Sequence, residues 1–139
     1  METVSNGKKV LLAEDYDDAR ILMALNLRHW GYEVFEAIDG KDALNQAAIW
    51  CPDLIIMDIS MPRLDGLEAA VSLRADPKTR EIPIIMATAH TRESLLSNAI
   101  AAGATDVLIK PYKLSDLRDI VEKYLPPALS DAISHERLL

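Results

Sequence analysis

The chain has 139 residues, of which 50% are hydrophobic and 27% charged, a balance that suits one domain with a real core and argues against disorder. The formal net charge of −7 disfavours direct binding to nucleic acid, because a phosphate backbone requires clustered positive charge. The single cysteine, Cys51, excludes an intrachain disulfide and argues against a thiolate zinc site.

Neither export nor membrane insertion is expected from this sequence. Residues 1–9 are polar and carry no apolar signal segment. No apolar run approaches the roughly 20 residues that a membrane helix needs. The lone cysteine fits a reducing compartment, so we expect a cytoplasmic protein.

Short apolar runs recur along the chain, and each is followed by a segment with helical periodicity. Several of these runs are almost continuously apolar, which is typical of strands buried on both faces of a parallel sheet. The predicted strands are Lys9–Ala13, Glu33–Ala37, Leu54–Ile59, Ile82–Ala87 and Val107–Ile109.

Between the strands, apolar residues recur at the spacing of a helix face. The segment Ala19–Trp30 is apolar on more than one face. We interpret the apolar content of Ile21–Trp30 mainly as core, with a docking face for a histidine-bearing partner helix as the alternative. Asp39 is positioned to cap the helix that follows it. The other predicted stripes comprise Ala43, Leu44, Ala47 and Ala48; Leu67, Ala70 and Val71; Leu96, Ala99, Ile100 and Gly103; and Leu117, Ile120, Val121 and Tyr124.

This alternation of strands and helices predicts an α/β fold with helices on both faces of a parallel sheet. Two consecutive prolines, Pro126 and Pro127, should end the last helix. We therefore expect one domain over residues 1–125 and a short C-terminal tail over 126–139, with no output domain. A domain excised from a longer protein would have the same sequence.

Chemically useful side chains follow most of the predicted strands. Open α/β sheets bind ligands beyond the carboxyl ends of their strands, where the strand order reverses. Each residue has an ordinary explanation by itself, such as a helix cap or a surface charge, but their shared placement at strand ends favours one site. The candidates are Glu14 and Asp15 after the first run, Asp58 at the end of the third, Thr88 after the fourth and Lys110 after the fifth.

This set of groups suits phosphoryl transfer. Clustered carboxylates repel one another unless a cation relieves them, and ligation by oxygen alone suits Mg²⁺. A carboxylate can act as the nucleophile and form an aspartyl phosphate. A metal ion, a lysine and a hydroxyl can then stabilise the phosphoryl oxygens.

At these residues the chain resembles the receiver domain of two-component response regulators, over about Lys9 to Leu125. The resemblance implies a flavodoxin-like three-layer sandwich, with a five-stranded parallel sheet in the order 2-1-3-4-5 and five helices. The matching segments are Leu11–Asp15, Met57–Gly66, Thr88–Ala89, Ala102–Ala104 and Lys110–Tyr112.

The resemblance also implies a role for each candidate residue. Asp58 is expected to be the phosphoacceptor, Thr88 to donate its hydroxyl to the phosphoryl group and Lys110 to pair with a phosphoryl oxygen. The Lys110–Pro111 peptide bond is expected to be cis. Mg²⁺, or Mn²⁺ in its place, would be held by Glu14, Asp15, Asp58 and the main-chain carbonyl of Ser60.

The implied partners are a sensor histidine kinase or a histidine phosphotransfer protein, and a downstream protein effector. Such a phosphorelay protein is not an enzyme, because it catalyses only its own phosphoryl transfer and dephosphorylation. Val107 occupies a position where many receivers carry a switch aromatic, so the usual aromatic readout is in doubt. The resemblance implies that Ser60 and His90 flank the path of an attacking water and tune the phosphoryl lifetime, with an ordinary surface residue as the alternative for His90.

Other functions remain open at this point. An interaction module of the same fold could act without phosphorylation, although a complete set of acidic and basic groups argues against it. A Mg²⁺-dependent phosphatase with an aspartate nucleophile usually has a second aspartate two residues later, where this chain has Ser60. A nucleotide or flavin site is disfavoured, because the loop after the first run is acidic and lacks glycine.

Overall fold

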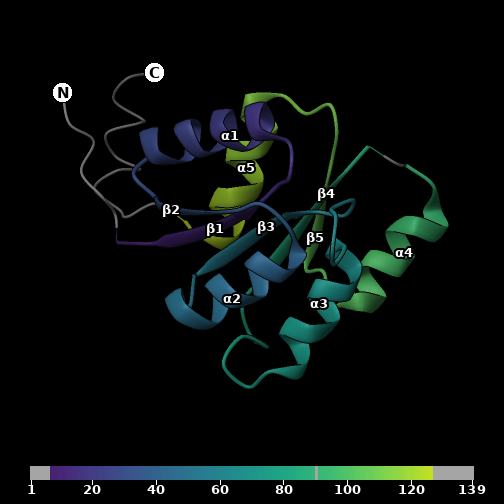
Figure 1. Ribbon diagram of the computed structural model, residues 1–139. Coiled ribbons are helices and arrows are strands. Elements are labelled where there is room, and N and C mark those ends of the chain that lie inside the picture. The colour runs from purple at the N-terminus through teal and green to yellow at the C-terminus, as the bar shows by residue number, and fades with distance from the viewer. Residues whose placement is uncertain (1–6, 90, 127–139) are drawn as a thin grey trace.

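The computed structural model describes residues 7–89 and 91–126, over which strands and helices alternate (Figure 1). His90 and residues 127–139, which include most of the expected tail, lie outside the described residues. The elements are β1 (Lys9–Ala13), α1 (Asp17–His29), β2 (Glu33–Ala37), α2 (Gly40–Trp50), β3 (Leu54–Asp58), α3 (Gly66–Ala75), β4 (Ile84–Thr88), α4 (Glu93–Ala102), β5 (Asp106–Ile109) and α5 (Leu114–Tyr124).

The strands form one parallel sheet in the order β2-β1-β3-β4-β5, which confirms the predicted topology. Helices α1 and α5 cover one face of the sheet, and α2, α3 and α4 cover the other (Figure 1). The strand order reverses between β1 and β3, where Ala13 lies opposite Met57. The carboxyl ends of these two strands therefore meet at the same edge of the sheet.

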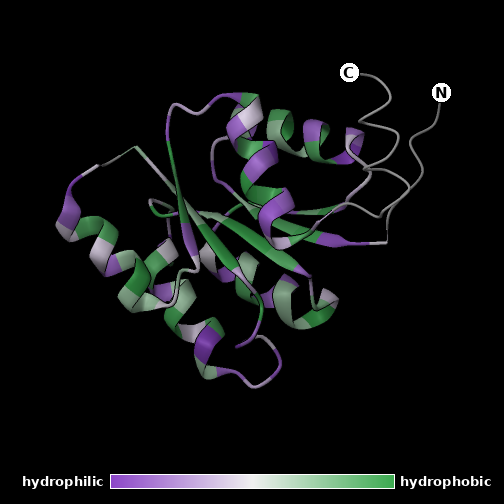
Figure 2. Cartoon of the chain, turned by 180° about the vertical axis from the view of Figure 1, so that it is seen from behind, coloured by the Kyte–Doolittle hydropathy of each residue, from purple (hydrophilic) through white to green (hydrophobic). Residues whose placement is uncertain are grey.

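Each strand contributes to two apolar clusters, one on either side of the sheet. Along β1, Val10 and Leu12 belong to the cluster under α1 and α5, whereas Leu11 and Ala13 belong to the cluster under α2, α3 and α4. The hydropathy colouring accordingly shows apolar strands between helices of mixed polarity (Figure 2). Burial on both faces explains why the sequence shows continuous apolar runs where strands form.

The predicted strand boundaries are correct to within two residues. The largest difference is at β4, which begins at Ile84 although the apolar run begins at Ile82. Pro83 has no N–H to donate to a ladder, and the N–H of Ile82 donates instead to the carbonyl of Thr79 in the preceding turn. This turn delays the start of the strand.

The predicted helix faces are correct only in part. Val71 on α3 and Ile100 on α4 are exposed, although the periodicity placed them on buried stripes. On α1, Met23, Ala24 and Leu27 are buried as expected. The interpretation of Ile21–Trp30 as mainly core is therefore wrong for its other apolar face, since Ile21, Leu22 and Leu25 are exposed.

Two close backbone approaches fix the loop that follows β3. A Cβ on Gly66 would lie 2.5 Å from the carbonyl oxygen of Asp58, and a Cβ on Gly40 would collide with the backbone of Leu64. Asp39 caps α2 as predicted, since its side chain accepts a hydrogen bond of 2.7 Å from the N–H of Asp42. The loop after Asp58 is therefore packed directly on the start of α2.

Candidate functional site

The candidate site lies at the carboxyl edge of the sheet, where β1 and β3 end side by side. Glu14 and Asp15 follow β1, and Asp58 is the last residue of β3. One carboxylate oxygen from each of these residues lies within 4.8 Å of the other two. The structure therefore brings together the three carboxylates that the sequence placed at two separate strand ends.

Glu14 is the buried member of this cluster. Its Oε1 lies 3.2 Å from the Lys110 ammonium, whereas its Oε2 is buried and has no hydrogen-bond partner among the residues that the structure describes. Burial, and after it the neighbouring Asp58, raise the pKa of the Glu14 carboxyl to about 7, although Lys110 offsets part of their effect. An orphaned buried oxygen of this kind needs either a proton or a cation.

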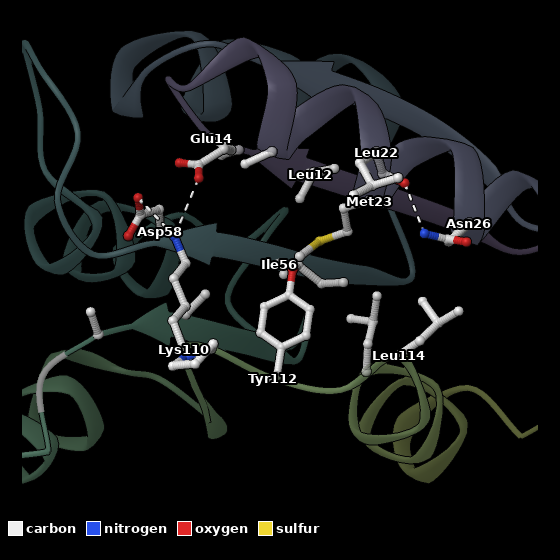
Figure 3. Close-up of a pocket in the computed structure, with 16 residues that line it drawn as sticks. Leu12, Glu14, Leu22, Met23, Asn26, Ile56, Asp58, Lys110, Tyr112 and Leu114 are labelled. Atoms are coloured by element: carbon white, nitrogen blue, oxygen red, sulfur yellow. Dashed lines mark hydrogen bonds and ion pairs between the residues drawn. The ribbon is translucent and has the colours of Figure 1, made fainter.

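Lys110 is the cation that the structure supplies to the cluster. Its Nζ lies 3.2 Å from Glu14 Oε1 and 3.4 Å from Asp58 Oδ2, and Figure 3 shows its side chain extending toward both carboxylates. Burial disfavours the charge on this lysine, but the charges of Asp58 and Glu14 outweigh that effect and raise its pKa. The Lys110–Pro111 peptide bond is cis, as the resemblance implied.

Asp58 and its neighbours are reachable from solvent. The Asp58 side chain is 15% exposed, and its Oδ1 accepts a hydrogen bond of 3.3 Å from the N–H of Ser60. Asp15 and Ser60 are both exposed. A reagent or a protein partner can therefore approach Asp58 from outside, while Glu14 closes the inner side of the cluster.

Thr88 ends β4, the strand that lies between β3 and β5. In the sheet register, Ala87 lies opposite Asp58 and Thr88 lies opposite Ile109. The carbonyl of Thr88 accepts a hydrogen bond of 2.8 Å from the N–H of Lys110. Thr88 is 2% exposed, so the threonine is buried at the carboxyl end of β4.

The residues of this site fit a hard divalent cation. Within the described part of the chain, all the donors of this cluster are oxygens, two of the three acidic residues are accessible, and one buried oxygen lacks a partner. Among the residues that the structure describes, Lys110 pairs with two of the three carboxylates, Glu14 and Asp58, so the ionised cluster keeps a negative charge. Oxygen ligands and excess negative charge are what Mg²⁺ requires in a protein site.

A cavity that the sequence did not reveal adjoins the acidic cluster. It has a volume of about 770 Å³ and runs from Asp58 and Lys110 between α1 and α5. Leu22 of α1, Leu114 of α5 and Tyr112 line its apolar part (Figure 3). Burial also raises the pKa of the Tyr112 phenol. The apolar character of Ala19–Trp30 was the one sequence feature that indicated an apolar surface on α1.

Two further residues lie on elements next to the site, Arg20 on α1 and Val107 on β5. Arg20 on α1 donates a hydrogen bond of 3.0 Å to the carbonyl of Glu14, a contact that sequence reasoning missed because it depends on the direction of one long side chain. Val107 of β5 is half-buried and packs against the cluster under α2, α3 and α4. The position of the usual switch aromatic is thus occupied by a small, stiff side chain.

The chain matches the family model described as the response regulator receiver domain over residues 10–122. It is 41% identical over 116 residues to the transcriptional regulatory protein PdtaR of Mycobacterium tuberculosis, and this match covers 83% of this chain and 55% of that protein. It is 33% identical over 126 residues to the phosphate regulon transcriptional regulatory protein PhoB of Rhizobium meliloti, covering 91% and 56% of the two chains. The chain spans about half the length of the curated relatives it matches.

Solved structures agree with this assignment. The chemotaxis response regulator CheY4 of Vibrio cholerae superposes with a TM-score of 0.81 at 32% identity, covering 84% of this chain and 98% of that one. The receiver domain of a sensor histidine kinase from Pseudomonas aeruginosa, solved with a magnesium ion coordinated in its active site cleft, has a TM-score of 0.79 at 35% identity, covering 85% and 97%. This chain belongs to the family of response regulator receiver domains of two-component signalling systems, and carries a cluster of three carboxylates at the carboxyl edge of its sheet.

Proposed function

We propose that Asp58 accepts a phosphoryl group from a phosphohistidine on a sensor histidine kinase or a histidine phosphotransfer protein. Phosphorylation then switches binding to a downstream protein effector. One observation carries this proposal: Asp58 lies in a cluster of three carboxylates within 4.8 Å, and the Lys110 ammonium lies 3.4 Å from its Oδ2. An accessible carboxylate beside a fixed cation is suited to attack on phosphorus.

In the transfer step, an oxygen of the Asp58 carboxylate attacks phosphorus. A phosphorus–oxygen bond forms, the phosphorus–nitrogen bond breaks, and the imidazole leaves with the electron pair and takes up a proton. In the return step, water attacks phosphorus, the aspartyl phosphorus–oxygen bond breaks, and inorganic phosphate and the carboxylate are released. The chain acts only on its own side chain, which agrees with a signalling module rather than a turnover enzyme.

Glu14, Asp15, Asp58 and the main-chain carbonyl of Ser60 would hold Mg²⁺, or Mn²⁺ in its place. When bound, the ion supplies positive charge to the carboxylates and to the phosphoryl oxygens. Lys110 is already beside Asp58 and would pair with a phosphoryl oxygen as a compact charge. The hydroxyl of Thr88, at the end of the adjacent strand, would donate to the same group.

The partner helix would dock on α1. The exposed apolar face of α1 is formed by Ile21, Leu22 and Leu25, and its Leu22 also lines the cavity that includes Asp58. A helix that carries a phosphohistidine could bury this face while its histidine reaches Asp58.

No helix of the described residues is long and apolar enough to cross a membrane.

Two further assignments belong to this proposal. We assign the receiver domain to residues 1–125 and a short tail to 126–139. The thiol of Cys51 is free and exposed, which supports a reducing, cytoplasmic location.

The chemistry can be tested by intact mass measurement. Wild-type protein incubated with Mg²⁺ and acetyl phosphate should gain one labile phosphoryl group, and chelation of the metal should abolish the gain. Asp58→Asn should not gain it. Asp65→Asn is the matched control, because Asp65 caps α3 outside the cluster and asparagine keeps that cap. Absence of a gain in the wild type, or an equal gain in Asp58→Asn, would refute the proposal.

A further inference from the structure

The guanidinium of Arg20 is a nearly buried cation next to the acidic loop. Its side chain is 11% exposed, and each of its nitrogens has an oxygen partner on a different segment. Nη1 donates to the Glu14 carbonyl at 3.0 Å and Nη2 to Asp17 Oδ1 at 2.7 Å. Nε lies 3.4 Å from Glu36 Oε1 on β2. Arg20 thus joins β2, the start of α1 and the loop that carries the acidic residues.

The contact with Glu14 reaches the main chain and not the carboxylate. The N–H of Glu14 donates to the carbonyl of Ala37 at 3.0 Å, which extends the pairing of β1 with β2 by one residue. The carbonyl that Arg20 holds belongs to the peptide group linking Glu14 to Asp15. Rotation of this peptide would swing both side chains, so the guanidinium fixes the directions of two neighbouring carboxylates at once.

Arginine suits this position better than lysine. Its planar fork can engage three partners in fixed directions, whereas an ammonium on a flexible stem holds fewer of them in defined geometry. Asp17 and Glu36 anchor the guanidinium from two elements, so it has little freedom to release the Glu14 carbonyl. The network is built to keep one peptide group in place.

We propose that Arg20 is a positioning residue of the cation site: by holding the peptide group between Glu14 and Asp15, it orients their carboxylates and strengthens the binding of a divalent cation. This inference rests on the proposed function of the same cluster as a Mg²⁺ site. Groups that orient metal ligands from outside the coordination sphere typically affect affinity strongly.

The sign of the effect separates positioning from simple electrostatics. Removing a positive charge near an acidic cluster should tighten the binding of a cation by itself, because one repulsion is lost. Loss of orientation should weaken binding. A weaker affinity in a variant that lacks the guanidinium therefore identifies positioning as the dominant contribution of Arg20.

Arg28 provides a matched control. It lies on the same helix and pairs with the same Glu36 at 3.1 Å, but its other contact is the carbonyl of Val34, away from the acidic loop. Arg28→Met removes the same charge and a partner of Glu36 without touching Glu14. Both variants are expected to lower the melting temperature of the metal-free protein, which a merely structural role would also do.

The test measures Mg²⁺ binding to the unphosphorylated protein by titration calorimetry, together with the Mg²⁺ dependence of phosphorylation by acetyl phosphate. Arg20→Met should bind Mg²⁺ roughly 10-fold more weakly than the wild type. Arg20→Lys should lose less affinity than Arg20→Met, and Arg28→Met should bind like the wild type. The phosphorylation rate of Arg20→Met should recover at saturating Mg²⁺, because the phosphoacceptor itself is intact.

Unchanged or tighter Mg²⁺ binding in Arg20→Met overturns the inference. Should Arg20→Met fail to fold, Arg20→Lys decides in its place: affinity equal to the wild type overturns the inference, and weaker affinity supports it. Failure of the proposed function is a separate result, in which the wild type binds Mg²⁺ but gains no phosphoryl group. In that case the dependence of cation binding on Arg20 would still stand.

Discussion

Raising the pH should weaken the fold of the metal-free protein, because Glu14 is harder to ionise in the folded state. The pKa of this carboxyl rises from the ordinary value of 4.5 to about 7 on folding, first through burial and then through Asp58. Between these two values the unfolded chain has already released the proton that the folded chain keeps. Ionisation therefore favours unfolding, and stability falls as the pH rises through this window.

The expected magnitude follows from the same values. A pKa change from 4.5 to about 7, at about 1.4 kcal/mol per pH unit, corresponds to roughly 3 kcal/mol. Glu14→Gln keeps the size of the side chain but cannot ionise. The free energy of unfolding of Glu14→Gln, relative to the wild type, should thus rise by about this amount between about pH 4 and about pH 8.

Urea denaturation in the presence of a chelator measures this difference at each pH. Glu33→Gln is the control, because Glu33 is exposed on β2 and should leave the pH dependence unchanged. Mg²⁺ should restore the stability of the wild type at high pH, since it binds the ionised cluster and not the unfolded chain. Parallel pH curves for wild type and Glu14→Gln would refute the assignment of the pH-dependent loss of stability to Glu14.

Three further outcomes can be checked independently. Gly40→Ala should lower the free energy of unfolding by roughly 1–3 kcal/mol in urea denaturation, because its Cβ would collide with the backbone of Leu64. Arg63→Asn should raise it by roughly 1 kcal/mol, because Arg63 has a φ of 68°, a region that asparagine tolerates better. Lys110→Met should slow phosphorylation by acetyl phosphate at saturating Mg²⁺, since it removes the cation 3.4 Å from Asp58; an unchanged rate would exclude that role.

The order of elements could be predicted from the sequence because the strands are buried on two faces. That burial makes residues 54–57 of β3 apolar at every position, which distinguishes the strand from the amphipathic helices. The exposed sides of the helices were less predictable. Val71 and Ile100 continue an apolar period but face solvent, because periodicity gives the repeat of a stripe and not the width of the surface that covers it.

The candidate site could be predicted as a set of residues but not as a geometry. Strand ends place Glu14 and Asp58 at one edge, and this follows from topology alone. The partnerless oxygen of Glu14 depends on which of its two oxygens Lys110 reaches. The contact of Arg20 with the Glu14 carbonyl depends on rotamers set by partners on two other elements. No spacing along the chain encodes such directions.

The charge balance of the cluster connects its pH dependence with its cation dependence. Three carboxylates share one ammonium, and Lys110 divides its contacts between Glu14 and Asp58. Burial of Glu14 and the repulsion from Asp58 both favour a proton on this carboxyl in the metal-free site, which is why the pKa of Glu14 is raised. A divalent cation relieves the same repulsion without the proton. Protonation of Glu14 and binding of Mg²⁺ should therefore exclude each other, so Mg²⁺ affinity should fall as the pH drops below about 7.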